Sequence, residues 1–240
     1  MTLNDIYLLS PELSIAILAG LLLVVDLCFH RKIHIAPIAI VGLAIPLGLS
    51  ILLWLDLDPT TRTLTNDGIL AKTFTVDRFS LFFKLLLIGT VATVILISRD
   101  HARRFRSFEA EFYSLLLFST SGMMLLSSSI ELVTIYVSLE LTALPVAALV
   151  AFSRDGRSSE ASLKFLVLSG ISSALLLYGM VLVYGLTGST VLSEISVRLS
   201  TIGFNTTFPT GSYALLLGII LLIAGFGFKI TAFPFQMWAP

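Results

Sequence analysis

The chain has 240 residues and no formal net charge at pH 7; 56% of its residues are hydrophobic and 12% are charged. A soluble domain carries about 25% charged residues to keep its surface hydrated, so this composition excludes an ordinary soluble domain and indicates a protein solvated by lipid. The basic residues are scattered over short loops and form no stripe, which argues against a nucleic-acid partner.

Seven apolar runs are long enough to cross a bilayer as helices, which takes about 17–25 residues each. In chain order they lie near 11–29, 35–55, 78–98, 111–129, 131–152, 160–187 and 212–234. The polar stretch from Ser127 to Glu131 predicts a tight turn between the fourth and fifth runs. We therefore expect an all-α membrane protein of about seven transmembrane helices, forming a single transmembrane domain over residues 1–240.

The distribution of Lys and Arg predicts how these helices are oriented. The loops after the first, third and fifth runs hold eight Lys and Arg, whereas the N-terminus and the other loops hold three. Basic loops stay on the cytoplasmic side, so the N-terminus is expected on the non-cytoplasmic side. Residues 1–12 contain no Lys or Arg, so we expect the first run to remain a helix and not to be cleaved as a signal peptide.

Two charged residues lie deep inside predicted membrane helices, where a charge costs about 2.5–3.5 kcal/mol. Glu140 lies near the middle of the fifth run, with Pro145 following it and predicting a disturbed helix beside the acid. Lys229 lies in the seventh run, between the potential helix breakers Gly225, Gly227 and Pro234. This pattern is typical of a discontinuous helix that lines a polar cavity. The alternatives are a protonated structural carboxylate and a lysine that snorkels to the interface.

Other charges in the apolar runs have simpler interpretations. Lys164 lies about one turn inside the sixth run, four residues after Glu160, which is a favourable spacing for a pair on the helix surface. Asp26 and Lys84 lie close enough to helix ends to reach the interface. Glu131 lies nine residues before Glu140 and so on the opposite helix face, at an end where water is available.

Motifs for cofactors and metals are missing from the sequence. There is no phosphate-binding glycine loop, no pair of histidines placed to hold haem and no cysteine cluster for an iron–sulfur centre. The three histidines lie in loops without cysteine partners. We therefore expect no cofactor and no metal in this chain.

Four blocks of sequence resemble one known family. Residues 105–116 read FRSFEAEFYSLL, residues 136–145 read YVSLELTALP, residues 160–170 read EASLKFLVLSG, and residues 225–240 read GFGFKITAFPFQMWAP. Together they resemble the antiporter-like membrane subunits of respiratory complex I, most of all subunit N, whose mitochondrial form is NADH dehydrogenase subunit 2. The family continues beyond the last block with a second, inverted set of helices, so the chain is expected to represent the N-terminal half.

The resemblance implies a proton-translocating subunit of an NADH–quinone oxidoreductase, in which Glu140, Lys164 and Lys229 transfer protons. It also implies no redox centre in this chain, and partner subunits that carry flavin and iron–sulfur clusters, bind quinone and include further antiporter-like subunits. The expected location is an energy-coupling membrane, either a bacterial plasma membrane or its organellar equivalent. The alternatives are a subunit of a cation–proton antiporter or a membrane-bound hydrogenase, and a scaffold with purely structural charges.

Overall fold

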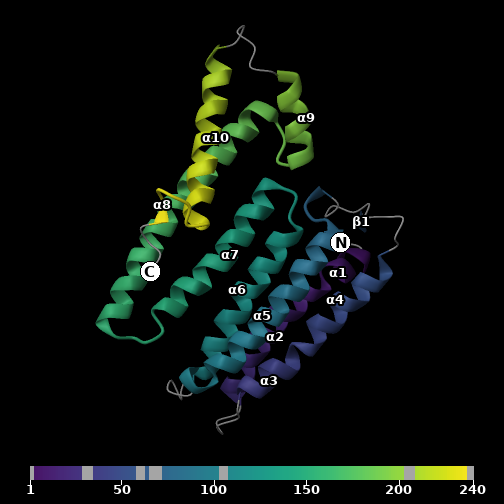
Figure 1. The fold of residues 1–240 in the computed structure, drawn as a ribbon, viewed down its shortest axis with the longest axis vertical. Helices are drawn as coiled ribbons and strands as arrows, with labels where there is room; N and C mark the ends of the chain where they lie inside the picture. Colours follow the sequence, from purple (N-terminus) through teal and green to yellow (C-terminus); the bar gives the residue numbers. More distant parts are fainter. Residues whose placement is uncertain are drawn as a thin grey trace.

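Helices make up nearly all of the computed structural model, which describes residues 3–28, 35–57, 63–64, 72–102, 108–202 and 209–236 (Figure 1). The long helices are α2 (Ser10–Cys28), α5 (Arg78–Ala102), α6 (Glu109–Ser128), α7 (Leu132–Val150), α8 (Gly156–Thr187) and α10 (Pro209–Lys229). The shorter helices are α1 (Leu3–Leu8), α3 (Ile35–Gly42), α4 (Ala44–Asp56) and α9 (Leu192–Ile202). Two short antiparallel strands, β1 (Thr63–Leu64) and β2 (Val76–Asp77), precede α5.

Each predicted apolar run coincides with a helix or a pair of helices. By length and apolarity, five segments of the described part of the chain could cross a membrane: Ser10–Cys28, Ile35–Asp56, Arg78–Arg99, Leu132–Val150 and Gly156–Thr187. The apolar part of α10, Tyr213–Lys229, is shorter, and α6 carries several hydroxyl side chains. An all-α membrane architecture is therefore confirmed, while the count of seven spanning helices stays a prediction.

The polar side chains of α6 are explained by its central position. This helix contacts α2, α5 and α7, and its hydroxyls are buried against these neighbours and not against lipid. The buried set is Ser114, Ser119, Thr120, Ser121 and Ser128. Several bond to backbone carbonyls across the helix contacts, as Ser114 does to Ala19 at 2.9 Å and Ser119 to Thr142 at 3.2 Å. Such hydroxyls join helices where no water can satisfy backbone groups.

The second predicted run is divided, because α3 ends at Gly42 and α4 begins at Ala44. Pro46 lies four residues after Gly42, so it cannot donate a hydrogen bond to the Gly42 carbonyl, and its ring crowds that carbonyl. Gly42 also meets α2 closely, since a Cβ there would lie 2.3 Å from a Leu18 methyl carbon. The proline therefore divides one membrane segment into two helices.

Two helices were absent from the sequence prediction. The short α1 precedes α2, and α9 follows α8 in the chain and lies beside one end of that helix (Figure 1). The first turn of α9 is anchored by Glu194, which accepts a hydrogen bond from Ser189 at 2.7 Å and faces Lys72 at 3.4 Å. The hydrogen bond from the Ser189 hydroxyl holds the pKa of the Glu194 carboxyl below its ordinary value, and the nearby Lys72 ammonium also contributes to this lowering.

The predicted turn between the fourth and fifth runs is confirmed, since α6 ends at Ser128 and α7 begins at Leu132. Three extended segments meet there, around residues 73–75, 129–131 and 190–192. Their backbone bonds include Ile130 to Thr73 at 3.0 Å and Leu192 to Ile130 at 3.1 Å. This small platform ties the starts of α5, α7 and α9 together at one end of the bundle.

The seventh run departs from its prediction in how the helix ends. The helix α10 is continuous through Gly225 and Gly227 and stops at Lys229, five residues before Pro234. Gly225 and Gly227 therefore do not break the helix in the described residues, and the discontinuity of the seventh helix stays a prediction. Thr231 ends the helix instead, with a φ of 56° and a bond from its N–H to the Phe228 carbonyl at 3.1 Å.

This helix end has the hydrogen bonds of a Schellman motif, completed by the Ala232 N–H bonding to the Gly227 carbonyl at 2.8 Å. A left-handed conformation is costly for a β-branched residue such as Thr231, which places strain at the end of α10. Gly225 serves packing: a Cβ there would lie 2.7 Å from the Leu176 Cβ of α8. Its missing side chain lets α8 and α10 pack in close contact, as Figure 1 shows.

Candidate functional site

The predicted acid and the predicted lysine form an ion pair. The Lys229 Nζ lies 3.2 Å from the Glu140 Oε1, and the two side chains are 11% and 24% exposed. Helix α7 supplies the acid, and α10 supplies the lysine as its last residue. The carbonyls at a helix C-terminus carry partial negative charge, so the end of α10 favours a cation at this position.

Two serines of α8 complete the site. Ser173 donates a short hydrogen bond to the same Glu140 Oε1, and the Lys229 Nζ also donates to the Ser169 Oγ at 3.1 Å. Ser169 and Ser173 lie four residues apart and therefore on one face of α8. Both hydroxyl side chains are buried, so three helices place two charges and two hydroxyls in one cluster.

A cavity of about 180 Å³ lies next to this cluster, between α6, α7, α8 and α10. Its polar wall consists of Thr142, Ser169 and Lys229. The remaining lining is apolar: Leu126, Leu139, Ala143, Val146, Phe165 and Phe228. The predicted cavity beside Lys229 is therefore present, but it is more apolar than the sequence interpretation expected.

Helix α7 carries Glu140 without a break, although Pro145 lies inside it. The proline leaves the Leu141 carbonyl without its helical donor, immediately after the acid. Helix α6 meets α7 closely at this level, because a Cβ at Gly122 would lie 2.8 Å from the Thr142 backbone nitrogen. The backbone around Glu140 is thus held by a neighbouring helix where its own hydrogen bonding is incomplete.

Lys164 lies apart from this cluster in the described part of the chain. Its Nζ bonds to the Glu160 carboxylate at 2.5 Å, and the two side chains are 69% and 65% exposed. Helix α8 begins at Gly156, earlier than predicted, with Asp155 accepting a hydrogen bond from the Ser158 N–H as its cap. Glu140 therefore pairs with Lys229, whereas Lys164 pairs with Glu160.

Sequence reasoning missed a second and more deeply buried ion pair. The Lys84 Nζ of α5 lies 2.6 Å from the Glu12 Oε1 of α2, with 0% and 2% of the side chains exposed. The prediction that Lys84 reaches the interface is wrong, because its side chain is fully buried and paired with Glu12. One signal in the sequence could have revealed this pair. The first and third predicted runs cross the membrane in the same direction, and Glu12 and Lys84 lie near the starts of these runs.

Two other acids have the positions that the sequence indicates. Asp26 is exposed two residues before the end of α2. Glu131 immediately precedes α7 and accepts hydrogen bonds from Thr134 and Thr190, each at 2.7 Å. Glu131 therefore fastens the start of α7 to the platform, away from the Glu140 cluster.

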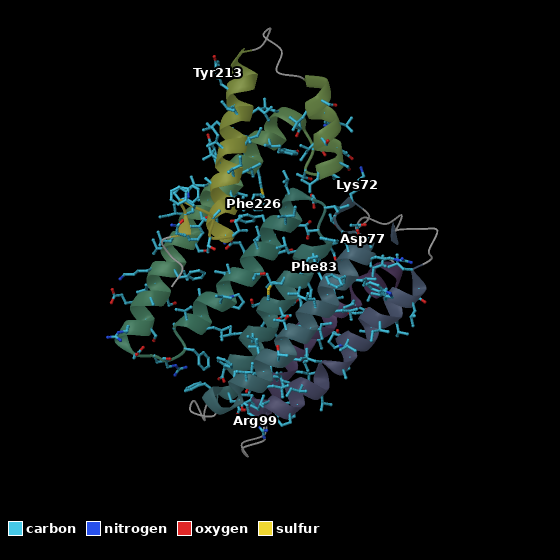
Figure 2. All side chains as sticks on the ribbon, viewed as in Figure 1. Lys72, Asp77, Phe83, Arg99, Tyr213 and Phe226 are labelled. Atoms are coloured by element: carbon cyan, nitrogen blue, oxygen red, sulfur yellow. The ribbon has the colours of Figure 1, made fainter. Side chains whose placement is uncertain are left out.

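Some predictions fall on residues outside the described part of the chain. Six of the loop cations used for orientation lie there: Arg31, Lys32, Arg62, Arg103, Arg104 and Arg106. The last four residues of the family block at 225–240 lie there as well. Of the cations that are described, Lys72 and Arg99 lie at opposite ends of the bundle (Figure 2).

Comparison with known proteins supports the resemblance. NADH-quinone oxidoreductase subunit N of Dehalococcoides mccartyi is 40% identical over 236 residues, covering 97% of this chain and 46% of the relative. A chain of respiratory complex I from Thermus thermophilus has a TM-score of 0.72 at 29% identity over 96% of this chain and 46% of its own length. A chain of the Mrp complex from a Dietzia species has the same TM-score at 19% identity, covering 99% of this chain and 43% of its own length, and this likeness shows the fold alone.

The chain thus spans about half the length of the curated relatives that it matches. The family described as NADH:quinone oxidoreductase/Mrp antiporter transmembrane proteins matches residues 129–240, which hold α7, α8 and α10 and therefore the whole Glu140–Lys229 cluster. The resemblance to subunit N of the NADH–quinone oxidoreductases is confirmed, and residues 129–240 of the chain are similar to the NADH:quinone oxidoreductase/Mrp antiporter family.

Proposed function

We propose that this chain is part of a proton-translocating membrane subunit of an NADH–quinone oxidoreductase, in which Glu140 and Lys229 bind and release protons. The observation that carries the proposal is their ion pair at 3.2 Å, held between α7 and α10 beside a cavity. Ionisable residues inside a membrane are costly and mark proton or ion pathways in many transporters. The likeness at 40% identity to a subunit N supports this assignment over an antiporter subunit.

The pair can carry one proton per cycle with its charges balanced. In the resting state the Glu140 carboxylate is negative and the Lys229 ammonium is positive. A proton that binds to Glu140 forms an O–H bond and leaves Lys229 without its counter-charge, which favours release of a proton from Lys229 by breaking one N–H bond. Transfer of the Glu140 proton to the neutral amine then restores the starting state, with one proton taken up and one released.

The magnitudes allow such a cycle. Two unit charges at the 3.2 Å separation of this pair attract each other by about 5 kcal/mol at an effective dielectric constant of about 20. Moving one charge against 100 mV costs about 2.3 kcal/mol. The Coulomb attraction within the pair is therefore larger than the work of moving one charge against 100 mV.

The remaining parts of the proposal concern the surrounding complex. Redox centres are proposed to lie in partner subunits with flavin and iron–sulfur clusters, and quinone to bind outside this chain. Lys164 and the discontinuous seventh helix remain parts of the proposal, since α10 ends at Lys229 and Lys164 faces outward on α8. In α8, 32 residues rise about 48 Å, more than the hydrocarbon core of about 30 Å, so Lys164 can lie near the interface.

The test uses the full-length subunit in the assembled complex, reconstituted in vesicles. Glu140→Gln removes the titratable group and is expected to lower the protons moved per electron, whereas Glu140→Asp retains a carboxyl near the same depth and keeps more of the pumping. Glu131→Gln is the matched control, because it changes the same residue type at the start of the same helix. Parent-like pumping by Glu140→Gln would overturn the proposal and favour a structural acid.

A further inference from the structure

The two α8 serines hold opposite members of the ion pair. Ser173 donates to the Glu140 carboxylate, while Ser169 accepts from the Lys229 ammonium at 3.1 Å. The Glu140 Oε1 accepts hydrogen bonds from both the Ser173 hydroxyl and the Lys229 ammonium.

A hydroxyl suits this position because it can both donate and accept a hydrogen bond. A carboxylate needs a donor, and a carboxylic acid needs an acceptor for its proton. An ammonium needs an acceptor, and a neutral amine can accept a hydrogen bond. By rotating, a serine hydroxyl can serve either form, whereas an ionised carboxylate in its place, which can only accept, would favour one form.

Few other titratable groups face the cluster from the helices packed against it. Tyr136 lies one turn before Glu140 on α7, and Lys229 is the charged residue of α10. Helix α8 carries Lys164, whose ammonium bonds to Glu160. Helix α6 contributes Leu126 to the adjacent cavity, and its two acids lie in its first turn at the opposite end. Within the described residues, the serines are therefore the polar partners of the pair besides its own members.

We propose that Ser169 and Ser173 are positioning residues that keep the Glu140–Lys229 pair hydrogen-bonded in both of its protonation states. The inference rests on the proposed function, since it assigns roles in a proton cycle. In that cycle Ser173 donates to ionised Glu140 and accepts from the protonated acid. Ser169 accepts from the Lys229 ammonium and donates to the neutral amine. Each hydroxyl keeps its own proton, so the number of protons carried is unchanged.

The two serines are expected to shift the pH profile of proton transfer in opposite directions. Ser173→Ala removes a donor to the carboxylate, so Glu140 binds a proton at higher pH. Ser169→Ala removes an acceptor from the ammonium, so Lys229 loses its proton at lower pH. Each midpoint should move by about one to two pH units, which corresponds to one hydrogen bond to a charged group. Ser173→Thr and Ser169→Thr keep the hydroxyl and should restore the parent midpoint.

Ser172→Ala provides the matched control for helix packing. Ser172 is buried on the same helix and donates to the Gly225 carbonyl of α10 at 3.1 Å, without touching either charged group. The experiment measures protons moved per electron against pH, with the full-length subunit in the reconstituted complex. Unshifted midpoints in both alanine variants of Ser169 and Ser173, or an equal shift in Ser172→Ala, would overturn the inference. If Glu140→Gln also pumps like the parent, the proposed function itself fails.

Discussion

The two buried ion pairs differ in their access to a proton. Glu12 and Lys84 are 2% and 0% exposed, whereas Glu140 and Lys229 are 24% and 11% exposed and lie beside a cavity. A fully enclosed pair has no route by which a proton can enter or leave, so we assign the Glu12–Lys84 pair a static role in holding α2 against α5. The Glu140–Lys229 pair has the partial access that exchange requires.

The static pair predicts a characteristic pattern of substitutions. Lys84→Met leaves the Glu12 charge buried without its partner and should destabilise the subunit by about 3–5 kcal/mol. The double variant Glu12→Leu with Lys84→Met replaces both charges by apolar side chains and should recover most of that loss. Thermal unfolding of the purified complex measures both effects. A double variant that assembles and is stable but no longer pumps protons would show that this pair takes part in transfer.

At the scale of single residues, the sequence predicts which charged residues are buried at depth but not which of them form an ion pair. The depth of Glu140 and Lys229 in apolar runs indicates both residues, yet they lie 89 positions apart and their contact depends on how α7, α8 and α10 pack. Glu12 escapes prediction because a residue near a helix start ordinarily reaches water. The burial of Glu12 depends on how the helices pack in the folded protein, and the same packing leaves the Lys164 side chain exposed.

The helices themselves are the most predictable elements, because long apolar runs have few alternatives in a membrane. Their ends are less predictable. The Pro46 effect at Gly42 and the cap at Asp155 are both readable from local chemistry, whereas the end of α10 at Thr231 is not, since a threonine rarely adopts a left-handed conformation. The sequence prediction missed helix α9 because this helix is amphipathic and is held by contacts of Glu194 with Lys72 and Ser189.

The direction of α2 and α5 across the membrane gives a prediction at this scale. Lys72 and Arg99 lie at opposite ends of the bundle (Figure 2), and the excess of basic residues predicts that the loop following α5 lies on the cytoplasmic side. Reporters fused before Met1 and inserted within residues 99–109 should therefore give opposite accessibility signals. A Lys72 insertion serves as the control and should match the Met1 signal. Equal signals from Met1 and the 99–109 segment are incompatible with this topology.

For the whole molecule, the fold and the buried pair support one account of how energy is used. Redox chemistry in partner subunits is proposed to change the separation or hydration of Glu140 and Lys229, and the pair converts that change into proton uptake and release. The chain covers about 46% of the length of a subunit N relative. The central claim is nonetheless local, because it requires Lys229 to titrate.

Substitution of Lys229 tests that claim most directly. Arginine keeps a positive charge but does not titrate in the working range, because its pKa stays above about 12, whereas alanine removes the charge. Protons moved per electron should be measured with the full-length subunit in the reconstituted complex, with NADH oxidation as the control for assembly. The account predicts that Lys229→Arg and Lys229→Ala both assemble and both lose most of the proton transfer through this subunit. Full pumping by Lys229→Arg where Lys229→Ala fails would contradict it, because Lys229 would then act as a fixed charge.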